Sequence, residues 1–339
     1  MITGPNGTMT TLANITGTPK NECIEWDNAE WVFTYRPPYM WFIFVLGFIE
    51  NLFVISVFVL HKSRCTVTEI YLGNMAATDL ILVSSLPFWA IYIFNKYYRP
   101  FGGFMCPLLS YLFQLNLYSS IYFLMMVSIE RYLALVKAMS IGRLRNPCWA
   151  KVICGIIWIF AAVFSAPNGV FRKVKFIKRL NISVCISVAP TTWIIFPNIL
   201  TNILGFLLPL VVTSFCTFRI VWFLKNNSMR QFKKVNKERK AARLVLSVFL
   251  LFIVCWLPYN ITILCFSILE RFNVHPTCMV RYINRVVYQI SYCLALSNSC
   301  INPVIYSMVG NQFRQKAREV YSRLLCKGPD RTTSSILTD

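Results

Sequence analysis

The sequence predicts an all-α membrane protein, in which a bundle of seven transmembrane helices is followed by an amphipathic eighth helix at the membrane surface. Of the 339 residues, 56% are hydrophobic and only 14% are charged, and the mean hydropathy is +0.55. Soluble domains are about one quarter charged, so this composition indicates a membrane protein. Seven apolar stretches approach or exceed the roughly 20 residues that a spanning helix needs, and they cover residues 38–60, 68–94, 103–136, 149–169, 192–224, 241–269 and 282–308. The apolar runs are continuous instead of alternating, which argues against a β-barrel.

The third apolar stretch is expected to organise the bundle. It begins near Cys106 and ends with the tripeptide Glu130-Arg131-Tyr132. At 1.5 Å per helical residue, Cys106 and Arg131 lie about 37 Å apart, which exceeds the roughly 30 Å hydrocarbon core of a bilayer. This helix therefore joins the two faces of the membrane.

The net charge of +21 is carried mainly by alternate loops. Basic residues follow the first, third and fifth spans and the last one, so the positive-inside rule puts these segments in the cytoplasm and the N-terminus outside. This distribution favours membrane topology over nucleic-acid binding. No cleaved signal peptide is expected, and glycosylation is expected at three sequons on predicted outer segments, at Asn6, Asn14 and Asn181.

The chain divides into four predicted parts. Residues 1–36 form an extracellular, glycosylated N-terminus, and 37–309 form the bundle. Residues 310–326 form an amphipathic helix, with Cys326 as a palmitoylation candidate. Residues 327–339 form a short cytoplasmic tail whose hydroxyl groups are candidate kinase sites.

Four of the thirteen cysteines fall on predicted outer segments. They are Cys23, Cys106, Cys185 and Cys278, and by themselves they allow three pairings. Five basic residues, from Arg172 to Arg179, precede Cys185 in the second outer loop. Two interpretations stay open for this loop: a solvated translocated loop, or an electrostatic lure for an acidic ligand or the acidic N-terminus.

Polar residues recur at similar depth in several spans. Asp79 is a charged residue within the second span, and it is a functional candidate because an ionisable residue inside a membrane is costly. The neutral residues expected around it are Asn116, Ser120, Asn298, Ser299 and Asn302. A carboxylate with neutral oxygen ligands suits a sodium ion; the alternative is a water-filled polar core. In the first span, Asn51 is expected to hydrogen-bond to a neighbouring helix.

An enzyme is not predicted. The chain has two histidines, His61 and His275, on opposite predicted faces of the membrane, so a histidine-rich metal site is excluded. It has no phosphate-binding glycine loop and no nucleophile-elbow serine. No cofactor is expected. A transporter or channel is a distant alternative, because paired broken helices are not apparent.

These motifs resemble those of the rhodopsin-like (class A) G protein-coupled receptors from end to end of the chain. One mark falls on each span: Asn51, the run Leu72–Asp79, Glu130-Arg131-Tyr132, Trp158, Pro209, Cys255-Trp256-Leu257-Pro258 and Asn302-Pro303-Val304-Ile305-Tyr306. Further stretches are similar to the bradykinin (kinin) receptors, the constitutive type more than the inducible type: Glu69–Asn74, Leu86–Ala90, Asn116–Ser120, Arg131–Lys137, Asn202–Leu210 and Ser297–Pro303.

The resemblance implies a receptor of the plasma membrane that passes peptide binding to a heterotrimeric G protein, typically of the q class. Receptor kinases, arrestin and membrane lipids are implied as further partners. The implied peptide contacts are Trp89, Ser110, Gln114, Tyr259, Arg285, Gln289 and Tyr292. The residues implied in activation and G-protein coupling are Ile121, Glu130, Arg131, Tyr132, Pro209, Phe252, Trp256, Pro258, Pro303 and Tyr306. The implied disulfides are Cys106–Cys185 and Cys23–Cys278.

The chain departs from the kinin receptors at the predicted outer mouth. Constitutive-type receptors carry acids there for the cationic N-terminus of the peptide, and the matching positions in this chain are Phe266 and Arg285. Like charges in a poorly hydrated mouth repel. The alternative interpretation is therefore a receptor of the same fold for a more acidic ligand, or a weakly signalling paralogue.

Overall fold

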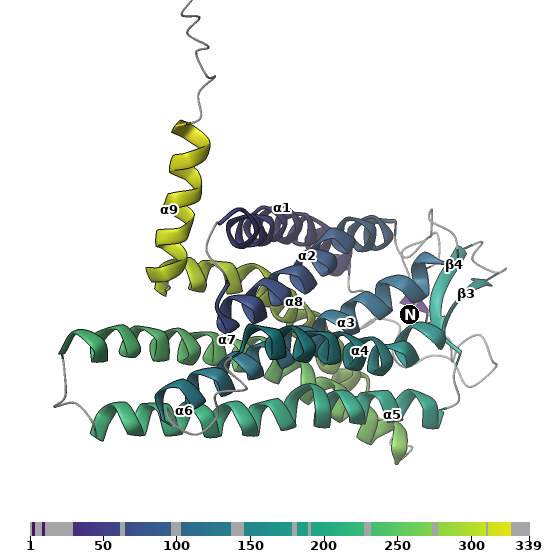
Figure 1. Cartoon of the computed structure of the whole chain (residues 1–339). Coiled ribbons are helices and arrows are strands. Elements are labelled where there is room, and N and C mark those ends of the chain that lie inside the picture. The colour runs from purple at the N-terminus through teal and green to yellow at the C-terminus, as the bar shows by residue number, and fades with distance from the viewer. Residues whose placement is uncertain are drawn as a thin grey trace, which may run out of the picture.

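The computed structural model describes residues 2–3, 9–10, 30–61, 65–95, 103–136, 146–177, 182–188, 191–226, 232–272, 277–309 and 311–326. Long helices dominate it, and their axes run roughly together in one bundle (Figure 1). The helices before the paired strands are α1 (Glu30–Leu60), α2 (Val67–Phe94), α3 (Met105–Leu135) and α4 (Pro147–Val170). The later ones are α5 (Thr191–Asn202), α6 (Leu208–Asn226), α7 (Phe232–Arg271), α8 (Cys278–Val309) and α9 (Asn311–Cys326).

Six spans are long and apolar enough to cross a membrane within the described residues: Trp31–Leu60, Val67–Phe94, Met105–Leu135, Pro147–Val170, Ile195–Asn226 and Leu246–Leu269. The 32-residue α8 is the seventh helix of the bundle, where it packs against α7 and α1. Large apolar side chains such as Phe42, Ile49 and Val59 are exposed on the outer helix faces. The predicted seven-helix class of membrane protein is confirmed.

The helix α3 lies at the centre of the bundle. It packs against α2, α4, α6 and α7. In its most apolar stretch 72% of the residues are buried, the largest share among the six spans. It is therefore the most enclosed helix of the bundle and contacts four other helices directly.

Local sequence signals set several helix boundaries. At the start of α2, the Thr66 hydroxyl accepts a hydrogen bond from the Glu69 amide, and the Glu69 carboxylate accepts one from the Thr66 amide. This capping box satisfies two backbone donors that the first helical turn leaves without partners. Asn146 caps α4 with a single hydrogen bond, which its side chain accepts from the Cys148 amide, and Pro147 occupies the first helical position. By contrast, α1 begins at Glu30, about two turns before the predicted span, and continues through Pro37 and Pro38.

Two polar contacts join helices inside the bundle. The Asn51 amide donates to the Gly47 and Ser299 carbonyls, at 2.8 Å each, and so ties α1 to α8. The Trp158 indole donates to the Asn74 side chain at 3.0 Å and ties α4 to α2. The structural role predicted for Asn51 agrees with this geometry.

Two antiparallel strands lie at one end of the bundle, and α9 lies at the other (Figure 1). Strand β3 (Arg172–Ile177) pairs with β4 (Ile182–Ser187), with Val174 opposite Cys185. A second, short pair joins β1 (Ile2–Thr3) and β2 (Met9–Thr10). Below, "hairpin end" means the end of the bundle with β3 and β4, and "α9 end" means the opposite one.

Candidate functional site

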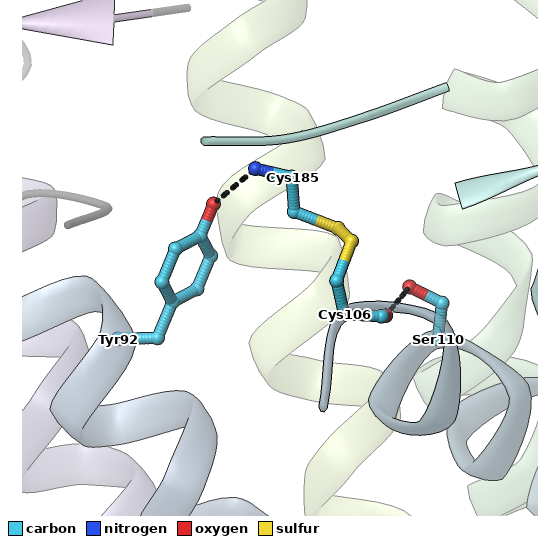
Figure 2. Close-up of a disulfide and its surroundings, with 4 residues drawn as sticks. All are labelled: Tyr92, Cys106, Ser110 and Cys185. Atoms are coloured by element: carbon cyan, nitrogen blue, oxygen red, sulfur yellow. Dashed lines mark hydrogen bonds between the residues drawn. A yellow bond between two sulfur atoms is a disulfide. The ribbon is translucent and has the colours of Figure 1, made fainter. Parts of the chain in front are cut away.

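A disulfide fixes the hairpin across its end of the bundle (Figure 2). Cys106, in the first turn of α3, is bonded to Cys185 of β4. The Cys185 amide donates to the Tyr92 hydroxyl of α2 at 3.3 Å, and the Ser110 hydroxyl donates to the Cys106 carbonyl at 3.2 Å. The pairing that the family resemblance implied is present. Cys278 is also disulfide-bonded, and its expected partner Cys23 lies outside the described residues.

The hairpin itself was not predicted from the sequence. Its second strand reads Ile-Ser-Val-Cys-Ile-Ser, and this alternation of apolar and small polar residues is the signal that would have indicated a strand. The exposed side chains of Arg172, Lys173 and Lys175 give the hairpin a positive surface.

Below the hairpin, five aromatic side chains form a continuous cluster, termed here the aromatic column: Phe113, Trp256, Tyr259, Tyr288 and Tyr292. Phe113 of α3 stacks on Tyr292 of α8, with ring centroids 4.7 Å apart, and lies 6.3 Å from Trp256 of α7. Two of the predicted ligand contacts, Tyr259 and Tyr292, belong to this column. Phe113 and Tyr288 were not predicted.

The other predicted ligand contacts line the same region. Gln114 is buried, and its amide donates to the Thr201 hydroxyl of α5 at 2.7 Å, so it ties two helices together. Trp89 packs against Tyr92, with ring centroids 6.1 Å apart. Gln289 accepts a hydrogen bond from Arg36 of α1.

Arg36 is a buried cation that the sequence reasoning missed. Its guanidinium carbon lies 4.4 Å from the centroid of the Tyr292 ring, and the side chain donates to Gln289. Arg285 is also buried, one turn of α8 from Gln289. Phe266 is 42% exposed. Of the two positions at which the resemblance implied acids, Arg285 is thus buried within the bundle and Phe266 is not.

The polar core forms around Asp79, which is fully buried. Its Oδ1 accepts hydrogen bonds from Asn116, Ser120 and Ser299 at 2.8, 3.0 and 2.9 Å, and its Oδ2 accepts one from Asn302 at 3.2 Å. Asn298 is buried, but among the contacts of the described residues it makes none with Asp79. All of the predicted neutral residues except Asn298 therefore contact Asp79.

The side-chain oxygens of two asparagines in this core have no hydrogen-bond partner among the described residues. They are Oδ1 of Asn116 and Oδ1 of Asn302. A buried acceptor without a donor is unfavourable, whereas two amide oxygens beside a carboxylate suit a hard monovalent cation. The residues present therefore fit a sodium ion.

Next to the aromatic column, the chain between α5 and α6 departs from α-helical geometry. Residues Ile203–Leu207 form a π-helical turn, η3, whose last hydrogen bond runs from the Leu208 amide to the Ile203 carbonyl. A Cβ added to Gly205 would lie 2.8 Å from a Leu117 methyl carbon, so glycine permits the close approach to α3. Pro209 is the second residue after this turn. The sequence predicted the proline but not the π-turn.

Four of the residues implied in activation, Ile121, Pro209, Phe252 and Trp256, are termed here the repacking residues. Phe206 of η3 contacts Phe252 of α7, with ring centroids 5.6 Å apart. Trp256, Ile121 and Pro209 are buried, and Pro258 lies inside α7. Pro303 is buried in α8, whereas the Tyr306 side chain lies outside the described residues.

At the α9 end, Arg131 is held by two side chains. Its Nε lies 3.3 Å from the Glu130 carboxylate, and a terminal guanidinium nitrogen donates to the Thr68 hydroxyl at 2.8 Å. The same hydroxyl donates to Glu130 at 2.7 Å. Tyr132 contacts Phe215 of α6 instead, at 5.8 Å between ring centroids. The family resemblance implied functional roles for Glu130 and Arg131, but Thr68 was not predicted.

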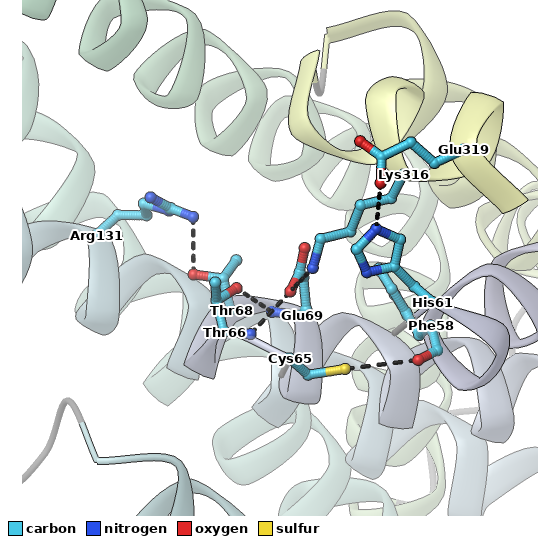
Figure 3. A network of polar contacts seen from close by, with 9 residues as sticks. All are labelled: Phe58, His61, Cys65, Thr66, Thr68, Glu69, Arg131, Lys316 and Glu319. Carbon is cyan, nitrogen blue, oxygen red and sulfur yellow. Dashed lines mark hydrogen bonds and ion pairs between the residues drawn. The ribbon is translucent and has the colours of Figure 1, made fainter. Parts of the chain in front are cut away.

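Helix α9 is held against this network by one ion pair and one hydrogen bond (Figure 3). Lys316 pairs with Glu69 at 2.8 Å, and His61 hydrogen-bonds to Glu319 at 2.9 Å. The hydrogen bond from His61 lowers the pKa of the Glu319 carboxyl. On the apolar side, Phe313 packs against two phenylalanines of α1, Phe53 and Phe58. The predicted amphipathic helix is therefore present, with its apolar side docked on α1, and it runs across the bundle axis (Figure 1).

The remaining predicted modification sites fall beyond the described part of the chain. Asn6, Asn14, Asn181 and the tail residues 327–339 lie outside the described residues, as does the side chain of Cys326.

A seven-helix bundle with a disulfide-fixed hairpin at one end and a held arginine at the other defines a transmembrane receptor. The family described as "7 transmembrane receptor (rhodopsin family)" matches residues 50–306, and the chain belongs to this family. Its members are receptors and not enzymes.

Within the family, the chain is similar to bradykinin receptors. It is 48% identical to the B2 bradykinin receptor of Cavia porcellus over 318 residues, which cover 93% of this chain and 85% of the relative. It is 48% identical to the B2 bradykinin receptor of Homo sapiens over 308 residues, 90% of this chain and 78% of the relative. Identity to the B1 bradykinin receptor of Tupaia minor is 37% over 319 residues, 91% of this chain and 90% of the relative. The predicted resemblance to the bradykinin receptors is confirmed.

Proposed function

We propose that this chain is a receptor for a kinin-type peptide, oriented in the plasma membrane with the hairpin end outside and the α9 end in the cytoplasm. The peptide binds between the hairpin and the aromatic column, and the receptor activates a heterotrimeric G protein of the q class, with phospholipase C activity and calcium release as the result. The aromatic column carries this proposal, because it runs from the hairpin end down to Trp256, which lies among the repacking residues.

The proposed signal is a shift between two packings of the same helices. A ligand that contacts Tyr292 and Tyr259 acts on Phe113 and Trp256 through packed rings whose centroids lie 4.7–6.3 Å apart. Repacking of Trp256 and Phe252 against η3 swings the α9 end of α7 away from α3. Arg131 is then released from Glu130 and Thr68 and contacts the G protein. The ligand must bind the active packing more tightly, since a ligand with equal affinity for both states shifts neither.

Calcium release tests the ligand and the G-protein class together. Cells that express the chain are challenged with intact bradykinin and with bradykinin lacking its C-terminal arginine, up to about 1 µM. We expect a calcium response to at least one form, which a phospholipase C inhibitor abolishes. Silence toward both forms, from a receptor that reaches the cell surface, would contradict the kinin assignment. A response without phospholipase C would contradict the q class alone.

A second candidate function is a receptor for a more acidic peptide. Two buried arginines, Arg36 and Arg285, and the exposed cations of β3 favour it, because all of them are positive at the hairpin end. This candidate predicts silence toward kinins together with activation by an acidic peptide.

We also propose a sodium ion in the Asp79 core, on the strength of the two amide oxygens without partners. Replacing Asp79 with asparagine removes the charge while keeping a similar shape. In the wild-type receptor we expect NaCl to weaken agonist binding several-fold relative to choline chloride, and in Asp79→Asn this difference should vanish. The readout is agonist competition in the two salts at equal ionic strength. Persistent sodium sensitivity in the variant would put the ion elsewhere.

A further inference from the structure

Arg36 has donor capacity that the described part of the protein does not use. A guanidinium carries five N–H donors and stays charged. One nitrogen donates to Gln289, and the Tyr292 ring covers a face of the group. The Nε has no hydrogen-bond partner, although the side chain is only 8% exposed. Within the described ranges, none of the ion pairs involves Arg36.

A buried cation without an anion is unfavourable, and the surroundings of Arg36 increase this cost. Arg285, Gln289 and Tyr292 are spaced four and three residues apart, so they share one face of α8. Arg36 rests on two of these residues, and the third carries a second buried positive charge. The hairpin adds exposed cations at the same end of the bundle. An anion bound here would compensate the charge of Arg36 and supply an acceptor for its Nε.

The rings below Arg36 restrict what kind of anion fits. Tyr292 lies between the guanidinium and Phe113, and Phe113 in turn contacts Trp256. An inorganic anion would use the charge but none of this aromatic surface. A peptide with an apolar side chain among its last two residues would use both, through its terminal carboxylate and that side chain.

The geometry points to Arg36 as the anchor for the C-terminal carboxylate of the peptide ligand, held by the guanidinium beside Gln289 while the adjoining side chains enter the aromatic column. This inference rests on the proposed peptide-receptor function. It gives α1 a direct part in ligand recognition. Arg36 is then the first in a series of contacts that continues through Tyr292 and Phe113 to Trp256. If Arg36 only held α1 against α8, replacing it would leave the difference in affinity between the C-terminal acid and its amide unchanged.

Binding of bradykinin and of its C-terminal amide to the full-length receptor in lipid nanodiscs tests the anchor. We expect amidation to weaken binding to the wild-type receptor by about 10–100-fold, as for loss of a charge-assisted hydrogen bond. In Arg36→Gln the two forms should bind within about threefold of each other, because the acid alone loses affinity. Arg36→Lys keeps the charge but not the planar fork and should retain part of the preference.

The matched control is Lys151→Gln, which removes one exposed positive charge from the start of α4, at the α9 end and away from the proposed ligand site. It should leave the acid-to-amide ratio at the wild-type value, even if both affinities change. An unaltered ratio in Arg36→Gln, or equal binding of acid and amide by the wild-type receptor, would overturn the anchor. If Arg36→Gln does not reach the membrane, the wild-type ratio and that of Arg36→Lys decide the question in the same way.

A second probe does not depend on the kinin assignment. N-acetylphenylalanine presents a terminal carboxylate next to an aromatic ring, and its amide differs only in charge. We expect ligand-observed NMR to detect the acid on wild-type receptor with a Kd near 1 mM, roughly that of a fragment of this size, and to detect neither the amide nor binding to Arg36→Gln. Arg36-dependent binding of this acid with no binding of bradykinin would refute the kinin ligand and keep the anchor. Bradykinin signalling together with an acid-to-amide affinity ratio that does not depend on Arg36 would refute the anchor and keep the kinin ligand. Absence of binding by every probe would refute both.

Discussion

Replacing Arg131 with alanine is expected to lower agonist-stimulated nucleotide exchange on the G protein by about 100-fold or more, while peptide affinity changes by less than about threefold. Truncating one partner of a buried, hydrogen-bonded charge pair in a protein interface costs about 2–5 kcal/mol, and 1.4 kcal/mol corresponds to a factor of ten. Arg131 lies about 37 Å from Cys106 along α3, so its replacement leaves the ligand site at the hairpin end intact. The measurement is GTP-analogue binding to purified G protein, beside competition with labelled bradykinin on the same membranes.

The Thr68→Val variant is the matched control for this position. It removes the hydroxyl that accepts from Arg131 and donates to Glu130, but it keeps the volume of the side chain. Because such hydrogen bonds stabilise the held arginine by about 1 kcal/mol, basal exchange should rise about fivefold while the agonist-stimulated maximum is kept. Undiminished exchange in Arg131→Ala, or reduced basal exchange in Thr68→Val, would contradict the role given to this end of α3.

The two ends of the receptor differ in how far the sequence could predict them. At the α9 end and in the polar core, the deciding residues are polar or charged within long apolar runs, as Asp79 and Arg131 are. A charge there has few physical explanations, so its partners could be sought among the few polar residues of the other helices. Asn116, Ser120 and Asn302 were found in this way, and all three contact Asp79.

At the hairpin end, the deciding residues look ordinary in the sequence. Phe113 is one of 27 phenylalanines, and only the crossing of α3 with α8 places its ring on Tyr292. Arg36 stands before two prolines, where a helix boundary is the expected interpretation. Helix α1 instead continues through both prolines, and its extension by about two turns brings the guanidinium to α8. Tertiary packing, which no local pattern encodes, decides both positions.

The Cys106–Cys185 disulfide links α3 to the hairpin. It thereby fixes the hairpin above the aromatic column. Breaking the Cys106–Cys185 bond in a Cys106→Ser, Cys185→Ser double variant should reduce stability by about 4 kcal/mol, as expected for release of a loop of 79 residues. That change is a large part of the roughly 5–15 kcal/mol that stabilises a typical domain. Without the bond, the Cys185 amide also loses its fixed position beside Tyr92. Peptide affinity should therefore fall at least about 100-fold, in contrast to the Arg131 variant.

The measurement is the fraction of receptor that still binds labelled peptide after heating in detergent, together with surface expression. Cys148→Ser serves as the control, because Cys148 is free and exposed at the start of α4. It should match the wild-type receptor in both assays. If the double variant kept wild-type affinity, the hairpin would not contribute to the ligand site. If it lost affinity without losing thermal stability, the bond would serve to position the hairpin over the aromatic column, with little effect on the bundle itself. The two readouts thus separate the contribution of the disulfide to folding from its contribution to recognition.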